Sequence, residues 1–235
     1  MLDQKSHRLN LTKILLKLYK DTEVASKLGF KGGTAAYLFY GLPRFSVDLD
    51  FDLLGKPDKK SREKLTNRIN KLLESDYTIK EQYDKHYTLF WLLSYKKGNH
   101  TIKIEVSKRP NQSRFEAKTF YGVKIPVMRL EDAITNKLMA VIGRKKMANR
   151  DLFDVHFFLN LLEADKINYK LIETETGLKP KQFYQKMYKV VTAKRKVSPL
   201  DGMGELLNEK QKNWVREKLI EELKQLVKIQ IDLFS

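Results

Sequence analysis

Cysteine is absent from the 235 residues, which excludes disulfide bonds and thiolate zinc sites. The four histidines are scattered, so a histidine-based transition-metal site is not expected either. No apolar run approaches the roughly 20 residues that a membrane helix needs. Apolar residues near the N-terminus alternate with lysines, which indicates an amphipathic helix rather than a signal peptide. We therefore expect a cytoplasmic protein that makes no contact with a membrane.

Acidic residues are in the minority. Lys and Arg number 46 against 29 Asp and Glu, so the formal net charge is +17 at pH 7. A basic globular surface favours polyanions such as RNA, or an acidic protein partner. A proteome rich in lysine would produce the same excess, so the charge by itself identifies no substrate.

Two neighbouring motifs carry the most information. The first is Lys31-Gly32-Gly33-Thr34, in which a glycine pair opens a short helix. The first N–H groups of such a helix can hold phosphate oxygens. The second is the expected strand Val47–Leu54, whose side chains alternate between two faces. Asp48, Asp50 and Asp52 share one face, where like charges repel unless open water or a cation lies against them.

A second expected strand, at residues 100–107, repeats this alternation. Its apolar residues face one way, and Lys103 and Glu105 face the other. If the two strands pair, Glu105 joins Asp48 and Asp50 as a third carboxylate. Three carboxylates can bind one or two Mg²⁺ ions, which also bridge triphosphate oxygens. The combined pattern predicts a metal-dependent reaction on a nucleoside triphosphate.

The same residues also have plainer interpretations. Alternating acids can be the solvated face of an antiparallel sheet, and for Asp52 solvent exposure is the favoured interpretation. Lys103 and Glu105 can form a cross-strand or solvent-facing pair, and a short glycine motif by itself marks only a turn. The order and close spacing of the motifs favour nucleotide chemistry over these alternatives.

The hydrophobic pattern changes after residue 127. We expect residues 1–127 to mix helices and strands, and residues 128–235 to be helical. The expected helices lie at 8–28, 34–40, after Asp58 as the capping residue, and near 130–143, 150–162, 180–194 and 205–233. The expected strands lie at 47–54, 77–83, 87–95, 100–107 and 121–127, with residues 110–124 otherwise irregular and a hairpin turn at Gly98-Asn99.

The helical half adds charged candidates. On a helix, Lys137 and Arg144 stand seven residues apart and project from one face, where two cations could hold a triphosphate. Asp151 and Asp154 come at the start of the next expected helix. Capping that helix is the plainer interpretation for both acids.

In order along the chain, these motifs resemble the nucleotidyltransferases of DNA polymerase beta-like fold. More narrowly, they resemble the AbiEii/AbiGii family of bacterial type IV toxin–antitoxin toxins. The resemblance spans residues 8–163 and rests on Lys31–Thr34 with Arg44–Asp50, Lys103–Glu105, Leu130–Lys137 continuing to Arg144, and Arg150–Asp154. Thr34 stands where many superfamily members have serine, a change that keeps the hydroxyl.

The resemblance implies an α+β protein, with a mixed β-sheet flanked by helices and then a C-terminal helical domain. It also implies an enzyme that moves a nucleoside monophosphate from an NTP to an acceptor hydroxyl and releases pyrophosphate.

Specific roles follow for the residues that match. Asp48 and Asp50 are expected to hold Mg²⁺, with Glu105 as the third metal ligand near the base position for the acceptor. We expect Gly32, Gly33 and Thr34 to cradle phosphate. Lys137 is expected to bind the triphosphate and is grouped with the three acids as catalytic. The other expected nucleotide-binding residues are Arg44, Ser46, Lys103, Arg144 and Asp151.

The positive charge makes RNA, and tRNA ends in particular, the expected acceptor. The resemblance implies a growth-inhibiting toxin that a cognate antitoxin restrains. Two alternatives stay open: the same chemistry on a protein or small-molecule hydroxyl, and a non-catalytic module that binds RNA or a partner.

Overall fold

The computed structural model describes residues 3–96, 100–110, 112–144, 147–193 and 198–234. The chain divides into two compact units, Met1–Arg129 and Leu130–Ser235. We call them unit 1 and unit 2 and describe each by itself. None of the helices in the described ranges is long and apolar enough to cross a membrane.

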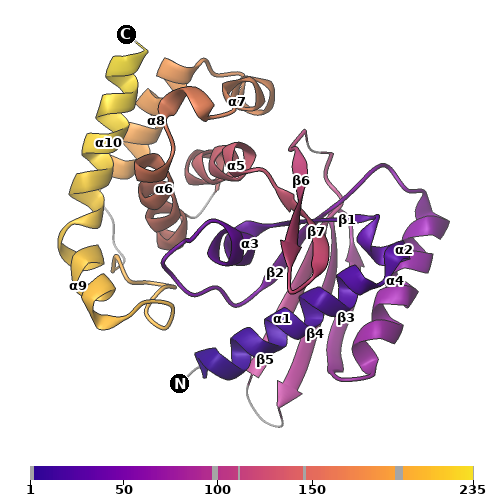
Figure 1. Cartoon of the computed structure of the whole chain (residues 1–235). Helices are drawn as coiled ribbons and strands as arrows, with labels where there is room; N and C mark the ends of the chain where they lie inside the picture. Colours follow the sequence, from indigo (N-terminus) through magenta and orange to yellow (C-terminus); the bar gives the residue numbers. More distant parts are fainter. Residues whose placement is uncertain (1–2, 97–99, 111, 145–146, 194–197, 235) are drawn as a thin grey trace. The chain divides into compact units, whose positions relative to one another are not determined.

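Unit 1 is built on a seven-stranded mixed sheet with the order β3-β4-β5-β2-β1-β7-β6 (Figure 1). β2 pairs in parallel with β5 and β1 in parallel with β7, and the remaining neighbours are antiparallel. The strands are β1 (Leu28–Lys31), β2 (Leu49–Leu53), β3 (Thr78–Lys85), β4 (Thr88–Lys96), β5 (His100–Ser107), β6 (Phe115–Phe120) and β7 (Val123–Met128).

Four helices of unit 1 are described: α1 (Gln4–Lys20), α2 (Thr22–Ala25), α3 (Gly32–Phe39) and α4 (Lys59–Glu74). α1 buries Leu11, Ile14, Leu15 and Leu18, a spacing of three and four that puts them on one helical face. These residues join a single apolar core with β2, β4 and β5. Asp58 caps α4, as predicted, by accepting a hydrogen bond of 2.8 Å from the backbone N–H of Ser61.

Unit 2 contains α5 (Leu130–Gly143), α6 (Asn149–Leu161), the short 3₁₀ helix η1 (Ala164–Lys166), α7 (Tyr169–Thr176), α8 (Pro180–Thr192), α9 (Glu209–Glu217) and α10 (Leu219–Leu233). α10 packs against α6, α8 and α9. Fully buried apolar residues such as Phe158, Phe183 and Leu223 form the interior of unit 2. The expected α+β architecture, a mixed sheet with helices followed by a helical region, is confirmed.

Several element predictions were wrong. The expected helix at 8–28 is instead α1, α2 and the short strand β1, because Asp21 ends α1 and caps α2. The segment expected to be irregular contains β6, which forms a hairpin with β7 through Tyr121 and Gly122, both at positive φ. In unit 2, α7 went unpredicted, and the expected helix at 205–233 is divided into α9 and α10. The expected turn at Gly98-Asn99 lies outside the described residues.

Candidate active site

The glycine turn, residues 31–34, and the acidic strand β2 meet in unit 1. Gly32 is the first residue of α3 and has φ +80°, a backbone conformation that residues other than glycine rarely adopt. A Cβ atom at Gly32 would lie 2.3 Å from Oδ2 of Asp50. The Asp50 carboxylate therefore occupies the space that any other residue at position 32 would need. The two sequence motifs form one structural feature.

The N-terminus of α3 is suited to an anion. Lys31, the N-cap residue, makes no side-chain hydrogen bond to the helix. Its ammonium group pairs instead with Asp52. The first N–H groups of a helix have no partner within the helix, and the helix dipole adds partial positive charge there. Backbone groups at Gly32 and Gly33 can thus bind phosphate oxygens.

Glu105 lies beside Asp50, as the sequence predicted. β2 and β5 are parallel neighbours, with Asp50 opposite Glu105 in the register. Glu105 and Lys103 are both exposed on β5, whereas Ile104 between them is fully buried. The predicted alternation of this strand is therefore confirmed. One face of the sheet presents two carboxylates and a lysine near the glycine turn.

Asp48 lies just before β2 rather than within it. Within the described ranges, no three His, Asp or Glu side chains form a ready-made metal cluster, so the three acids do not make a preformed three-ligand site. The donor set still fits Mg²⁺, which prefers oxygen ligands and usually takes one or two carboxylates together with substrate phosphates and water. Asp50, which lies against the glycine turn, is placed where a carboxylate and a phosphate could share a cation.

The hydroxyl of Thr34 is buried. It donates a hydrogen bond to the backbone oxygen of Asp48 and lies 2.9 Å from the Ser46 hydroxyl. Thr34 is 0% exposed, so the whole residue is buried, and its hydroxyl braces the segment that carries Asp48.

Arg44 and Ser46 also pack against the start of α3. Both side chains are buried, and a Cβ atom at Gly33 would lie 2.9 Å from the Ser46 hydroxyl and 3.0 Å from a guanidinium nitrogen of Arg44. Another guanidinium nitrogen of Arg44 donates to the backbone oxygen of Phe45 at 3.1 Å. The structure brings the predicted residues Gly33, Arg44 and Ser46 together, with the two side chains packed beneath the turn.

His7 was missed by the motif analysis. Its Nε2 lies 2.8 Å from the backbone oxygen of Val47, and its Nδ1 lies 2.8 Å from the Tyr95 hydroxyl. Because a carbonyl only accepts, Nε2 carries the proton of this contact. His7 thus supports the residue directly before Asp48. The available signal was its position, four residues before Leu11 on the buried stripe of α1.

Asp52 is not solvent-exposed, and that expectation was wrong. It is 1% exposed and pairs with Lys31. Burial raises the pKa of the Asp52 carboxyl, and Lys31 opposes the shift only in part. The register places Gly29 opposite Asp52, and the Phe115 ring lies against Gly29. This aromatic cover explains why the face is dry at Asp52 and more open at Asp50.

Unit 2 holds a cluster of charged residues. Lys137 on α5 lies 3.1 Å from Oδ1 of Asp151 and 2.8 Å from Oδ2 of Asp154, both on α6. Arg144 pairs with Asp151 at 2.9 Å between Nε and Oδ2. Both carboxylates are fully buried. The capping interpretation was wrong, because Ala148 is the N-cap of α6 and both acids pair instead with Lys137 of α5. Arg144 lies just after Gly143, the last residue of α5, so the prediction that Lys137 and Arg144 share one helix was also wrong.

The chain is similar to known proteins over most of its length. A family model described as nucleotidyl transferase AbiEii toxin, type IV TA system, matches residues 14–228. The crystal structure of JHP933 from Helicobacter pylori matches with a TM-score of 0.64 and 24% identity, covering 99% of this chain and 94% of that one. A candidate nucleotidyltransferase from H. pylori matches with a TM-score of 0.63 and 24% identity, covering 99% and 97%. At this identity the two structures show a shared fold. No curated protein sequence matches significantly.

Proposed function

The chain belongs to the AbiEii family of nucleotidyltransferase toxins of type IV toxin–antitoxin systems, and we propose that it transfers a nucleoside monophosphate from an NTP to a hydroxyl of RNA, with tRNA as the first candidate. Membership implies a nucleotide substrate and an antitoxin partner. The observation that carries the proposed chemistry is the contact between Asp50 and the Gly32 turn, with Glu105 on the adjacent strand.

The phosphate end of the nucleotide is assigned to the start of α3. N–H groups at Gly32 and Gly33 bind phosphate oxygens, and the absence of a side chain at Gly32 lets the phosphate approach Asp50. Buried Thr34 holds the segment that carries Asp48. Exposed Lys103 adds positive charge on the face that carries Glu105. The buried side chains of Arg44 and Ser46 hold the turn in shape.

The reaction replaces the phosphoanhydride bond between the α- and β-phosphates of the NTP by a phosphoester bond to the acceptor. The acceptor oxygen attacks the α-phosphorus, the bond to the bridging oxygen breaks, and pyrophosphate leaves with the electron pair. The exposed carboxylate of Glu105 takes the proton from the attacking hydroxyl. Asp48, Asp50 and Glu105 would hold Mg²⁺, which when bound stabilises the charge that develops on the leaving group.

We assign Lys137, with Arg144 and Asp151, to triphosphate binding on the strength of the family resemblance. In unit 2 the charge of Lys137 is shared between two buried carboxylates. This pairing holds the lysine side chain in one position while 17% of it remains exposed. Asp154 belongs to the same arrangement as a positioning residue.

The choice of RNA rests on charge. An excess of 17 positive charges at pH 7 favours a polyanionic acceptor. A protein or small-molecule hydroxyl is the second candidate, since the same groups would serve that reaction. A non-catalytic binding role requires the carboxylates at positions 48, 50 and 105 to have no chemical use.

The test uses purified wild type and Asp48→Ala with Mg²⁺, each labelled NTP in turn, and total bacterial RNA. We expect wild type alone to label RNA, and we expect EDTA to abolish the label. Digestion with nuclease or with protease then identifies the acceptor. Label that survives nuclease and is lost with protease would favour the second candidate. No label with any NTP, in RNA or protein, would contradict the proposal.

A further inference from the structure

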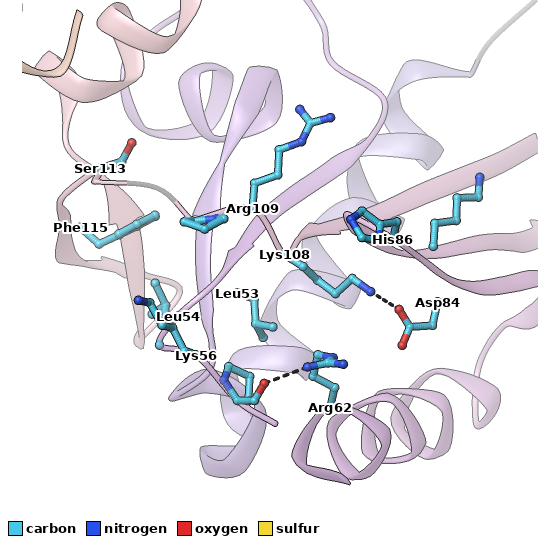
Figure 2. A pocket seen from close by; sticks show the side chains of 14 residues that line it. Leu53, Leu54, Lys56, Arg62, Asp84, His86, Lys108, Arg109, Ser113 and Phe115 are labelled. Carbon is cyan, nitrogen blue, oxygen red and sulfur yellow. Dashed lines mark hydrogen bonds and ion pairs between the residues drawn. The ribbon is translucent and has the colours of Figure 1, made fainter. Parts of the chain in front are cut away.

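A wide pocket opens in unit 1 at the end of the sheet where β2 and β5 finish (Figure 2). Its volume is about 780 Å³. Four parts of the chain line it: the end of β2 with the loop that follows, the start of α4, the β3–β4 turn, and Lys108–Pro110 with Ser113 and Phe115. None of the predicted site residues lines it. It is therefore a feature that the proposed reaction does not use.

Cations dominate this pocket. The lining includes Lys56, Arg62, Lys85, Lys108 and Arg109, with Asp84 as the acidic member. Asp84 pairs with Lys108. Nη1 of Arg62 donates to the backbone oxygen of Pro57 at 2.9 Å, which holds the guanidinium beside the loop (Figure 2). Five cations against one carboxylate favour a ligand with several negative charges.

Exposed aromatic rings lie next to these cations. Tyr87 is 50% exposed, with the Arg109 guanidinium carbon 5.0 Å and the His86 ring 4.2 Å from its ring centroid. Tyr83 is 46% exposed, with the Lys85 ammonium 5.2 Å from its centroid. Aromatic rings among basic side chains can stack on unpaired bases, while the cations hold the phosphates. An isolated phosphate ion would use neither the rings nor the spread of charge.

The pocket lies apart from the carboxylates along the same two strands. Leu53 in its lining follows Asp50 by three residues on β2, and Lys108 follows Glu105 by three at the end of β5. Three residues of strand span about 10 Å. The pocket and the carboxylates are therefore close enough for different nucleotides of one RNA strand to occupy both places.

We propose that this pocket is a docking site for single-stranded RNA, which binds phosphates through Lys56, Lys85 and Arg109 and stacks a base on Tyr87. The choice of RNA rests on the proposed function, in which RNA is the acceptor. The pocket would hold a part of the acceptor away from the reacting hydroxyl. It would therefore set which RNA is used without taking part in the chemistry.

The test compares two charge-matched double variants. One carries Lys56→Glu with Arg109→Glu, at two exposed positions of the pocket. The control carries Lys71→Glu with Lys80→Glu, at two exposed positions of the same unit outside the pocket. Circular dichroism and urea denaturation establish that both fold. Binding of a fluorescein-labelled single-stranded RNA of about 12 nucleotides is measured by anisotropy without NTP, over a range of salt concentrations.

We expect the pocket variant to bind the RNA at least about tenfold more weakly than wild type at about 0.15 M salt. The slope of log affinity against log salt should fall by about 1.4, since each lost phosphate contact contributes about 0.7. The control variant should stay within about threefold of wild type and keep most of the slope. Equal losses in both variants, unchanged binding by the pocket variant, or no binding by wild type would each overturn the proposal.

A transfer assay on the same proteins separates this inference from the proposed function. If wild type labels RNA and the pocket variant does so with unchanged KM, the docking site is wrong and the proposed function stands. If binding depends on the pocket but no NTP labels any RNA, the proposed function fails and the docking site stands.

Discussion

Replacing Gly32 with alanine tests the contact on which the active-site assignment rests. A Cβ atom there would lie 2.3, 2.8 and 2.9 Å from Oδ2, Cβ and Cγ of Asp50. Ordinary contact begins near 3.4 Å, so the Asp50 carboxylate would have to move on the order of 1 Å. The substitution also places alanine at φ +80°, which costs about 1 kcal/mol by itself.

Gly41→Ala is the matched control. Gly41 has φ +70° in the same unit, but a Cβ atom there would meet nothing within 4 Å. Gly41→Ala should therefore lower the free energy of unfolding only by the backbone strain of about 1 kcal/mol. Gly32→Ala adds an overpacking cost of about 1–3 kcal/mol, so its free energy of unfolding should fall further by that amount. Urea denaturation of the three proteins measures both differences.

Activity gives the second measurement. A displacement of about 1 Å in a reacting group can cost about 100-fold in rate, so we expect Gly32→Ala to lose that much nucleotide transfer. Gly41→Ala should transfer at the wild-type rate. If both variants lose the same stability and keep the same activity, Asp50 does not lie against the turn and the reasoning is refuted.

Three further predictions concern buried charges. Lys137→Met leaves Asp151 and Asp154 without their shared cation and should lower the free energy of unfolding by about 3 kcal/mol in urea; a loss below about 1 kcal/mol would contradict this. Burial lowers the pKa of His156, so wild type should lose stability relative to His156→Gln between about pH 7 and pH 5; parallel profiles would refute the shift. Burial raises the pKa of Asp52, so wild type should lose stability relative to Asp52→Asn as pH rises from about 4 to 7; a gain would contradict it.

The local features of the fold were predictable from the sequence. The alternation of Leu49 and Phe51 with acids identified β2, and the same period in β5 led to the correct pairing with Glu105. The Asp58 cap could be predicted because its hydrogen bond joins residues only three positions apart. Each of these signals depends on a few neighbouring residues.

Features that depend on distant residues could not be predicted. The strand β1 has only four residues and takes its identity from its pairing with β2 and β7. Asp52 is buried because the Phe115 ring covers the opposite Gly29, a contact across 86 positions that no periodicity records. The strand register also explains the ion pair of Asp52. Lys31 lies opposite Asp50 and therefore diagonally from Asp52, close enough for its ammonium group to pair with that carboxylate.

The candidate site divides in the same way. The order of the motifs along the chain pointed to the glycine pair and to the acids. In the structure Asp50 does lie against Gly32. The seven-residue spacing predicted Lys137 and Arg144 on one helix, but α5 ends at Gly143, and the spacing gave no sign that Asp151 of α6 pairs with both cations. His7 carried no motif at all, since its partner Val47 lies 40 residues away.

The central claim is that the carboxylate at position 50 takes part in nucleotide transfer. Asp50→Asn removes its charge, and Asp52→Asn removes a neighbouring charge that is buried and engaged with Lys31. With Mg²⁺, labelled NTP and RNA, we predict that Asp50→Asn loses at least about 100-fold in initial rate, while Asp52→Asn stays within about threefold of wild type. Equal rates for Asp50→Asn and wild type would contradict the claim.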